Sequence, residues 1–595
     1  MPKIEVNEQV FYTLAGCPNG KSRWKTRDEF EEALVCAKAE LDSDLWSADG
    51  DKNIPEAERT LKIELNDTNR PDLWGTAGCA RQLRIYNDGK IPEYPFFSRP
   101  GNIKNALRKV KVESSVKQVR PYLTGFIAAG KSITDPMLRD IIQTQEKLAW
   151  NFGRKRRSMS MGIYRISDSQ KKPLIKWPII YKGADPDAVS FVPLQWEGKL
   201  TLREILKQHP KGKEFAFIQE HEKIHPLLTD SEGNILSYPP IINSNDLGTV
   251  QVGDDEVFVE ITGTDLPLIT LAASIVACDL SDNGFNIEPV EIEYDFDTPF
   301  GRKIVTPYYF QEPVFCSLSR VERFLGDRLN ADECVAALTR MGVKSEKVKD
   351  IERGQQGETD GVRAYPPEYR NDFLHAADVA EDVMIGRSLG SFKPQRPADS
   401  TVGRLLPITL FSRQVKELFV GMGYQEMIYN YLGSRKDLVE NMRGDGAKII
   451  RIFNPMTENY EYVRDSILAS LMASESISAR SVYPHKIFEV GKIAWLDNGE
   501  NYRSKTRQYA GFLHAGNDAN FNTAAAELQT LFYYLSREYD VEESSDSRFI
   551  SGRAAAIILN GKQVGVFGEL HPEIMENWGV TVPCTAGEMD LDALI

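Results

Sequence analysis

The chain has 595 residues, too many for one hydrophobic core, and at about 150 residues per domain it predicts about four domains. With 42% apolar and 27% charged residues, its composition is that of an ordinary globular protein. The net charge of −14 argues against a protein dedicated to packaging nucleic acid, whose domains are usually basic, but it permits a local basic surface that contacts phosphates.

The seven cysteines are scattered and form no CxxC pair, so they indicate reduced thiols in a cytoplasm and neither a disulfide framework nor a zinc site. The N-terminal segment has no basic region followed by an apolar one, and it therefore predicts no secretory signal. The most apolar run, Leu266–Cys278, contains a proline and is too short to span a bilayer. We interpret it as a buried helix and expect a cytoplasmic protein without a membrane segment.

The first 97 residues mix short strands with helices. Apolar residues at helical spacing predict a helix over Thr26–Glu40. A predicted strand, Thr60–Leu65, runs into the turn Asn66–Gly75, which leads to a second helix over Leu73–Tyr86. We predict an N-terminal domain over residues 1–97.

Residues 98–285 contain strands and helices intermixed, and we predict that they form a second domain. The stretch Lys104–Arg120 carries six lysines and arginines against one acid. The predicted helix Asp135–Phe152 ends in the basic run Arg154–Arg157. Two short strands are expected within Pro239–Asp265, before the apolar helix.

An extended connector is expected over residues 286–310, and a small domain over residues 300–395. The elements predicted for this domain are helices over Arg320–Leu325, Asn330–Met341 and Asp372–Ile385 and a polar loop over Lys344–Thr359. A proline-containing linker, Gly386–Ser400, leads to a final α/β domain over residues 401–595. The elements predicted there are strands over Lys486–Val490 and Ala555–Leu559 and a helix over Ala524–Glu538. The sequence shows no internal repeat.

The segment YPPEYRNDFLHAADVAEDV, Tyr365–Val383, is the most distinctive motif. Its two prolines hold the chain extended, and Asp372 or the residue before it can cap the predicted helix. On that helix Asp378, Glu381 and Asp382 are spaced i, i+3 and i+4, so they share roughly 100° of arc.

Like charges at i and i+4 destabilise a helix by a few tenths of a kcal/mol. A hard cation such as Mg²⁺ would offset this repulsion, because it prefers carboxylate and water oxygens. A solvated acidic face, with Asp372 acting only as a helix cap, explains the same spacing, and spacing alone favours this simpler interpretation.

The pattern of this segment, P-x-x-R-x-D-x-x-H-x-x-D-x-x-E-[DE], resembles the B5 domain of phenylalanyl-tRNA synthetase β subunits. The sequence has every position of the pattern, including Arg370 and His375. In that family the carboxylates are assigned as Mg²⁺ ligands near the other subunit. The resemblance therefore implies a Mg²⁺ site, whose ligands would be Asp372, Asp378, Glu381 and Asp382.

Further motifs extend the resemblance over nearly the whole chain. The start MPKIEV and the turn NDTNRPDLWG are similar to the archaeal form of the subunit, within the archaeal and eukaryotic type. The motifs that look like the B3/B4 domain are KIHPLL (Lys223–Leu228), PPIINS (Pro239–Ser244) and EITGTD (Glu260–Asp265). The motifs that look like the final domain are FNPMTENYEYVRDSILASLM (Phe453–Met472), FEVGK (Phe488–Lys492) and VGVFGELHPE (Val564–Glu573).

The resemblance implies a multidomain α+β fold with four parts. They are a B1-like domain over residues 1–97, a B3/B4 editing-type domain over 98–285, a small winged-helix-like B5 domain over 300–395, and a class II synthetase-like antiparallel-sheet domain without catalytic motifs over 401–595. An adenylating enzyme must clamp a triphosphate with placed arginines and metal carboxylates. The chain ends in CTAGEMDLDALI, without the arginine that class II enzymes carry there. We therefore assign it no adenylation chemistry, and we expect Arg464 to form a structural salt bridge.

A pocket that selects phenylalanine rejects an analogue with one added hydroxyl by only about 10²-fold, so a second, hydrolytic site for tyrosyl-tRNA has a physical motive. The resemblance places this editing pocket on Leu228, Ser237, Glu260 and Thr262. Glu260 stands where relatives can carry aspartate, which changes the reach of the carboxylate. In a strand Glu260 and Thr262 point to the same face, as a pocket requires; the alternative is an edge strand whose polar side lies in water.

By resemblance the chain is a β subunit of phenylalanine–tRNA ligase (EC 6.1.1.20) in an α₂β₂ heterotetramer. The α subunit would bind ATP and phenylalanine and charge tRNA(Phe). This chain would support that site, share in tRNA binding and hydrolyse mischarged tyrosyl-tRNA. The two basic stretches could contact tRNA phosphates, although a solvated basic face explains them equally well. The alternatives are a free-standing aminoacyl-tRNA deacylase and a purely structural scaffold subunit.

Overall fold

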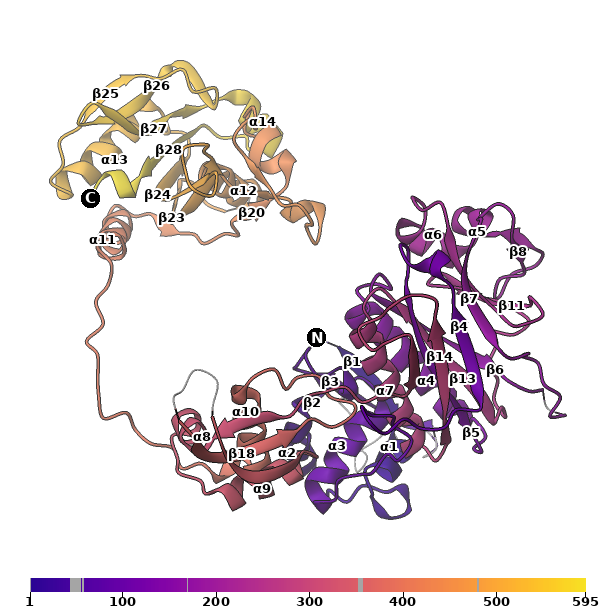
Figure 1. Cartoon of the computed structure of the whole chain (residues 1–595). Helices are drawn as coiled ribbons and strands as arrows, with labels where there is room; N and C mark the ends of the chain where they lie inside the picture. Colours follow the sequence, from indigo (N-terminus) through magenta and orange to yellow (C-terminus); the bar gives the residue numbers. More distant parts are fainter. Residues whose placement is uncertain (1, 43–54, 56–57, 169, 352–356, 479–480) are drawn as a thin grey trace. The chain divides into compact units, whose positions relative to one another are not determined.

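The structure is a computed structural model that describes residues 2–595 apart from 43–54, 56–57, 169, 352–356 and 479–480. The chain forms two compact units, Met1–Gln395 and Arg396–Ile595 (Figure 1). Each unit combines helices with mainly antiparallel sheets, so the predicted multidomain α+β class is confirmed. Within the described residues, no helix combines the length and the apolar character needed to cross a bilayer.

A small antiparallel sheet with the order β1-β3-β2 begins the first unit. The elements of this domain are β1 (Lys3–Asn7), α1 (Glu8–Leu14), α2 (Arg27–Leu34), β2 (Ala39–Leu41), β3 (Thr60–Leu65) and α3 (Thr76–Asp88). The helix predicted over Thr26–Glu40 ends at Leu34, and a 3₁₀ turn follows it. Lys38 then adopts a left-handed conformation, with φ of 51°, that turns the chain into β2.

A sheet of ten strands forms the largest part of the first unit. Its order is β12-β11-β10-β7-β4-β14-β5-β13-β6, with β15 paired to β14. The strands are β4 (Arg108–Val112), β5 (Tyr122–Ala129), β6 (Met159–Arg165), β7 (Ile179–Ala184), β10 (His225–Thr229), β11 (Ile235–Tyr238), β12 (Ile242–Asn243), β13 (Glu256–Gly263), β14 (Asn286–Tyr294) and β15 (Lys303–Thr306). The connector predicted over residues 286–310 is therefore wrong, because Val290, Ile292 and Tyr294 bury alternate positions of β14 in the middle of the sheet.

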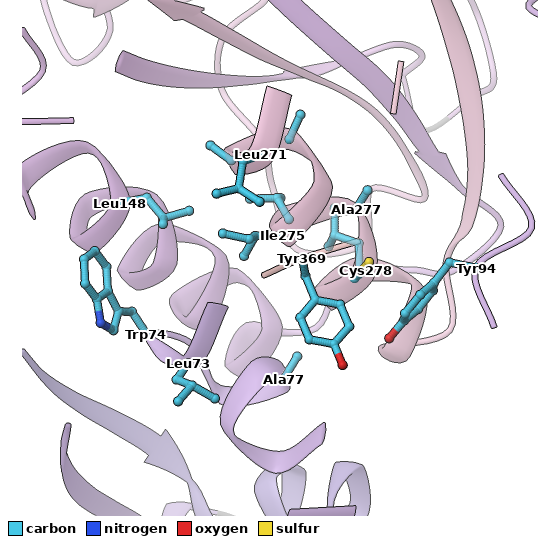
Figure 2. Packing of buried hydrophobic residues seen from close by; sticks show 14 of the residues in the cluster. Leu73, Trp74, Ala77, Tyr94, Leu148, Leu271, Ile275, Ala277, Cys278 and Tyr369 are labelled. Carbon is cyan, nitrogen blue, oxygen red and sulfur yellow. The ribbon is translucent and has the colours of Figure 1, made fainter. Parts of the chain in front are cut away.

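Helix α7 (Leu266–Asp282) packs on β5 and β13 and is buried along most of its length, which confirms the predicted buried helix. Its side chains share one hydrophobic cluster with Trp74 of the N-terminal domain and with Tyr369, which lies further along the chain (Figure 2). The other helices of this region are α4 (Asp135–Lys147), which continues into a π-helical turn (Leu148–Phe152), α5 (Leu202–Gln208) and α6 (Pro210–Phe215). The domains of the first unit therefore share a continuous core.

A second small sheet, with the order β16-β18-β17, completes the first unit. Its elements are β16 (Val314–Ser317), α8 (Leu318–Leu325), α9 (Ala331–Arg340), β17 (Lys344–Asp350), β18 (Thr359–Tyr365) and α10 (Ala376–Arg387). The polar loop predicted over Lys344–Thr359 is wrong for β17, an edge strand whose many exposed polar side chains conceal its strand character; residues 352–356 of that prediction lie outside the described residues. The last helix was predicted to begin at Asp372. It begins instead at Ala376, and the side chain of His375 caps it.

The two small domains have the same order of elements, which the sequence did not reveal. Each runs strand, helix, helix, strand, strand, helix, and in each the third strand lies at the centre of the sheet. The conclusion that the chain has no internal repeat therefore holds for its sequence but not for its architecture.

The second unit is built on a seven-stranded sheet with the order β19-β23-β24-β28-β27-β26-β25. All neighbours in it are antiparallel except β19, which runs parallel to β23. Its strands are β19 (Gln425–Glu426), β23 (His485–Leu496), β24 (Ser504–Ala515), β25 (Asp540–Glu543), β26 (Phe549–Leu559), β27 (Lys562–Leu570) and β28 (Cys584–Asp590). The helices are α11 (Pro407–Gly421), α12 (Leu468–Ser478), α13 (Phe521–Tyr534) and α14 (Pro572–Trp578), and a small sheet consists of β20 (Leu432–Gly433), β21 (Ile450–Arg451) and β22 (Tyr462–Val463).

Candidate functional site

The two ends of the ten-stranded sheet meet at one point. Strand β6 closes one end of the strand order, and β11 lies next to the last strand at the other end. Nevertheless the hydroxyl oxygen of Tyr164 on β6 lies 2.8 Å from Oγ of Ser237 on β11. The sheet therefore curls until its ends face each other.

Glu260 lies on β13 at the centre of this contact. In the pairing of β13 with β6, Gly162 stands opposite Glu260, so this face has room beside the carboxylate. The Tyr164 hydroxyl lies 2.8 Å from Oε2 of Glu260. Since a phenol has a single proton, a Tyr164 that donates to an ionised Glu260 must accept from Ser237. The three groups form a hydrogen-bonded relay that ends at the carboxylate.

The electrostatic environment of Glu260 is unusual for a carboxyl group. The residue is 2% exposed, and burial raises its pKa from 4.5 to about 7, against the opposing effects of the Tyr164 hydrogen bond and the Arg120 charge. None of the ion pairs in the described part of the chain involves this carboxylate. A buried carboxyl that titrates near neutrality and faces a cavity is a candidate functional group.

A cavity of about 180 Å³ opens beside Glu260. An apolar cavity of about 150 Å³ can bind benzene, so this one has room for a single aromatic ring. Among the lining residues, Glu260, Tyr164 and Ser237 are buried and form what we call the floor. Arg156 and Lys211 are half-buried and form what we call the rim. The cavity therefore has an acidic floor and a basic rim.

Gly162 keeps the cavity open. A Cβ atom at this position would lie 2.2 Å from the Tyr164 hydroxyl oxygen and 2.6 Å from Oε2 of Glu260. These separations are far below van der Waals contact, so any side chain at position 162 would displace the floor.

The structure brings two of the four predicted pocket residues, Ser237 and Glu260, to the cavity wall. Thr262 shares a strand face with Glu260, but its hydroxyl accepts a hydrogen bond from Nε of Arg120 at 3.0 Å. Leu228 is fully buried on β10, opposite Ser237 in the antiparallel pair. Strand β13 lies between β5 and β6, so the edge-strand alternative is wrong.

Sequence reasoning missed Tyr164 and Arg120. Tyr164 belongs to an alternating set with Ser160 and Gly162 on β6, and this alternation was the available signal. The pairing that sets this face against Glu260 joins strands far apart in sequence, and no local pattern reveals it. Arg120 lies in a basic stretch that predicted phosphate contacts, yet it is buried, and burial lowers its pKa to about 10.

His209 also lines the cavity, but both of its ring nitrogens are engaged. Nδ1 accepts the backbone N–H of Lys211 at 3.1 Å, so Nε2 carries the proton and faces the Leu194 carbonyl oxygen at 3.2 Å. Backbone groups therefore occupy both ring nitrogens of His209. Glu260 is therefore the titratable group that the floor presents to a ligand.

The four carboxylates predicted as metal ligands do not converge on one point. Arg370 donates to Asp372 at 3.0 and 2.6 Å and to Asp382 at 2.6 and 3.1 Å, and all three residues are buried. Burial alone would raise the pKa of Asp372, but the charges of Arg370 and Arg70 outweigh it and hold that pKa below its usual range. A guanidinium group occupies the position where a cation would neutralise these two carboxylates.

The other two predicted ligands bind elsewhere. Oδ2 of Asp378 accepts the backbone N–H groups of Leu374 and His375 at 2.8 and 2.6 Å, and Glu381 pairs with Lys38 at 2.9 Å. Within the part of the chain that the structure describes, no group of three or more Asp, Glu, His and Cys side chains is arranged to hold a metal ion. The arrangement does not fit Mg²⁺, which needs oxygen ligands directed at one centre.

A matching ion pair lies beside this cluster. Arg70 donates to Asp72 through two hydrogen bonds of 2.8 Å, and its Nε lies 4.0 Å from Oδ1 of Asp372. Both pairs have the pattern R-x-D, and each precedes the last helix of its small domain. The carboxylate motif is therefore part of a buried ionic network that joins the two small domains.

Known proteins resemble the chain over its full length. Residues 314–387 match the tRNA synthetase B5 domain, and residues 393–591 match the phenylalanyl tRNA synthetase beta chain CLM domain. The phenylalanine–tRNA ligase beta subunits of Treponema pallidum subsp. pallidum and Borrelia garinii subsp. bavariensis are 41% and 43% identical to it, each over 100% of both chains. The chain belongs to the phenylalanyl-tRNA synthetase β-subunit family. The predicted family and the predicted function as a ligase subunit of protein biosynthesis are thereby confirmed.

A solved N-terminal fragment of the phenylalanyl-tRNA synthetase β subunit from Pyrococcus horikoshii also resembles this β subunit, with a TM-score of 0.54 and 33% identity. The match covers 65% of this chain and 99% of the fragment. The β-subunit designation implies an α-subunit partner and binding of tRNA. The relatives with the identities given above are spirochaetal, so the archaeal and eukaryotic subtype stays a prediction.

Arg464 of the CLM domain forms the structural salt bridge that the sequence predicted. Its side chain is fully buried and pairs with Glu489 at 2.8 Å, and it also donates to Ser470 at 3.1 Å. Both of these partners, Glu489 and Ser470, are buried.

Proposed function

We propose that this β subunit hydrolyses tyrosyl-tRNA(Phe) formed in error, with the tyrosine ring in the cavity beside Glu260. The observation that carries the proposal is a buried carboxyl group without a cationic partner that faces a cavity of about 180 Å³, the size of one aromatic ring. Burying an unpaired carboxyl group destabilises the fold. A group of this kind that faces a cavity is a candidate for binding a ligand through a hydrogen bond.

The floor distinguishes tyrosine from phenylalanine. An ionised Glu260 accepts a hydrogen bond from the phenol of tyrosine. This bond replaces a hydrogen bond to water that the carboxylate loses when it is buried. A phenylalanine ring leaves the carboxylate without that partner. Sites built to hydrogen-bond a hydroxyl reject the analogue lacking it by about 10⁴-fold, so correctly charged tRNA is spared.

Hydrolysis takes place at the rim, where the ester emerges from the cavity. The oxygen of a water molecule adds to the ester carbonyl, the bond from the carbonyl carbon to the ribose oxygen breaks, and a proton passes to that oxygen. The products are free tyrosine and intact tRNA. The positive charges of Arg156 and Lys211 favour the negative charge that develops on the carbonyl oxygen.

The test measures deacylation of tyrosyl-tRNA(Phe) by the reconstituted complex of this chain with its α subunit. We expect Glu260→Ala to lower the rate by about 10²-fold or more, because it removes the hydroxyl-reading group. Phenylalanine charging by the same preparation reports correct assembly and should not change. If Glu260→Ala and Thr262→Ala both left the deacylation rate unchanged, the pocket would be wrongly assigned.

We also propose the α₂β₂ heterotetramer, with ATP and phenylalanine bound by the α subunit. The second unit supports a partner surface, because Phe453 and Met456 are fully exposed large apolar side chains. Replacing both with Asp should weaken co-purification with the α subunit. A stable monomer with full deacylase activity would instead favour a free-standing aminoacyl-tRNA deacylase.

We extend the proposal to the subtype, the domain layout and the location. The near-complete coverage of the Pyrococcus fragment supports the archaeal and eukaryotic type. The matches at residues 314–387 and 393–591 support the two domains predicted at 300–395 and 401–595, the first of them beginning after β15 ends at Thr306. They follow the predicted domain at 1–97 and a second domain that extends past the predicted 98–285 to Thr306, because β14 and β15 belong to its sheet. All seven cysteines are buried free thiols, which suits the reducing cytoplasm. Mg²⁺ at the B5 carboxylates is not part of the proposal, since those carboxylates already have partners.

A further inference from the structure

The turn Arg154–Arg157, which we call the basic turn, has an unusual backbone. Arg154, Lys155 and Arg156 have φ values of 50°, 55° and 64°, so three successive non-glycine residues occupy the left-handed region. Such conformations persist only where the surroundings hold them, and they concentrate at functional sites. The preceding turn is π-helical, which is a second irregularity typical of functional sites.

Hydrogen bonds tie the basic turn to the editing cavity. The backbone N–H groups of Lys155 and Arg156 donate to carbonyls of the π-helical turn at 2.8 and 2.9 Å. The buried Arg120 side chain donates to the carbonyls of Arg156 and Arg157 at 3.2 and 3.1 Å, and to the hydroxyl of Thr262 at 3.0 Å. The same guanidinium therefore fixes both the basic turn and the strand that carries Glu260.

The charges of the basic turn point to solvent. Arg154, Lys155 and Arg157 are exposed and pair with no carboxylate in the described part of the chain. Two exposed aromatic rings accompany them: Nζ of Lys155 lies 5.2 Å from the Trp150 ring centre, and the Arg157 guanidinium lies 4.9 Å from that of Phe217. Cations beside exposed rings can bind phosphates and stack bases together.

A second cavity, of about 900 Å³, lies beside the basic turn. Its volume is in the range of sites that enclose whole small molecules, about 300–1,000 Å³. Arg154 lines it, and it shares Arg156 and Lys211 with the smaller cavity, so the rim separates the two spaces. Glu146 and Glu214 also line it, and Glu214 is paired with Lys211 at 3.0 Å.

We propose that the basic turn, Trp150 and the larger cavity together bind the single-stranded 3′ end of aminoacyl-tRNA and direct its ester to the rim. The proposal rests on the editing function proposed above. Phosphates contact Arg154 and Arg157, and a base that precedes the terminal adenosine stacks on Trp150. The terminal adenosine lies between Arg156 and Lys211, with its tyrosyl group in the smaller cavity.

Single-stranded RNA fits this surface better than duplex RNA does. Proteins recognise duplex RNA mainly through its shape and backbone, whereas unpaired bases stack on aromatic side chains. The chain as a whole carries a net charge of −14, so a cluster of unpaired cations at the mouth of a cavity is a local exception that attracts a polyanion to this place.

The first test compares two substrates of the full complex, tyrosyl-tRNA(Phe) and the phosphate-free ester tyrosyl-adenosine. For tyrosyl-tRNA we expect Arg154→Ala with Arg157→Ala to lower deacylation kcat/KM about tenfold, and to reduce the slope of log(kcat/KM) against log[salt] by about 1.4, since each phosphate contact on a single strand contributes about 0.7. Turnover of tyrosyl-adenosine should stay within about twofold. Equal losses for both substrates, or an unchanged slope, would overturn the proposal.

Matched variants separate stacking and charge from general damage. Trp150→Ala should lower kcat/KM for tyrosyl-tRNA at least about fivefold, and Trp150→Phe should restore most of it, because phenylalanine keeps a stacking face. Lys131→Ala with Lys172→Ala removes the same charge from exposed positions of this domain outside the basic turn and should have no effect. If this control lost as much activity as the basic-turn variant, the effect would be one of net charge.

The second test locates the 3′ end whether or not the complex edits. A tRNA(Phe) with tyrosine joined through a stable amide and a photoreactive base before the terminal adenosine is cross-linked to the complex, and the modified peptide is mapped. A cross-link within residues 150–157 supports the surface even if the wild-type complex fails to hydrolyse tyrosyl-tRNA, which would defeat only the editing function. Cross-links on this chain confined to other peptides would refute the surface.

Discussion

Two sites in the first unit bury carboxyl groups, and they differ in how the protein compensates for burying a negative charge. Asp372 and Asp382 lie against Arg370, and their charges are neutralised within the protein. Glu260 has hydroxyl partners and a cavity instead, and burial raises its pKa to about 7. Breaking a buried ion pair by removing one partner is strongly destabilising, whereas a buried carboxyl without a cation is already in an unfavourable position.

This difference distinguishes a site that stabilises the fold from a site that can bind a ligand. At Arg370 the protein supplies the countercharge, so no ligand is needed and the network holds two small domains together. At Glu260 the protein withholds the countercharge and leaves a space, so a hydrogen-bond donor from outside can complete the site. The motif that is most distinctive in the sequence therefore supports the fold, and the less distinctive one supports the proposed function.

The largest expected effect comes from breaking the ionic network. Arg370→Met should destabilise the first unit by about 3–5 kcal/mol, because Asp372 and Asp382 remain buried without a counterion. Thermal unfolding of the assembled complex measures this loss, with hydrogen exchange of α10 as a local probe. Arg363→Met is the control and should have little effect, because the two ion pairs of Arg363 with Glu346 and Asp350 lie at the solvent-accessible surface of the small sheet. An equal, small shift in both variants would show that the buried network contributes no more than a surface pair.

The next largest expected effect is a gain in stability when the Glu260 carboxyl group is removed. Burial raises the pKa of Glu260, so between about pH 4.5 and 7 the folded protein binds more protons than the unfolded chain, and stability falls as pH rises through this window. Glu260→Gln removes the penalty and should stabilise the first unit by up to about 3 kcal/mol at pH 8, but by much less at pH 5. Melting curves at the two pH values decide it. A loss of stability at pH 8 would mean that the protein does neutralise Glu260.

A smaller effect follows from filling the space beside Glu260. Gly162→Ala places a methyl group against Tyr164 and Glu260, so deacylation of tyrosyl-tRNA should fall about tenfold or more, which is about 1.4 kcal/mol in transition-state binding. Gly421→Ala, where a methyl group meets open space, is the matched control. Deacylation at the wild-type rate in Gly162→Ala would show that the substrate ring does not enter this cavity.

The sequence predicted local features better than long-range ones. The strand over Thr60–Leu65 and the buried helix from Leu266 follow from short patterns that need no distant partner. The meeting of Glu260 with Tyr164 depends on the curl of a ten-stranded sheet, and no local pattern encodes that curl. For the carboxylate motif, spacing alone favoured a solvated acidic face, and the family resemblance predicted a metal. Neither shows which cations arrive from elsewhere in the fold. The decisive cations are Arg370, whose position in the motif was known but whose direction was not, and Lys38 from the N-terminal domain.

The smallest expected effect tests whether Mg²⁺ binds the carboxylates that already pair with Arg370 and Lys38. A ligand that binds only the folded state stabilises it by about 1.4 kcal/mol when present at ten times its dissociation constant. Because Asp372 and Asp382 are held by Arg370, and Asp378 and Glu381 by backbone N–H groups and Lys38, Mg²⁺ finds no set of free oxygens at one centre. Raising Mg²⁺ from zero to 10 mM at constant ionic strength should therefore leave the unfolding temperature of the isolated chain unchanged. A saturable increase in the unfolding temperature that Asp378→Asn or Glu381→Gln abolishes would show that these carboxylates can leave their present partners for a metal ion. Both carboxylate sites would then bind ligands, and they would differ only in the kind of ligand.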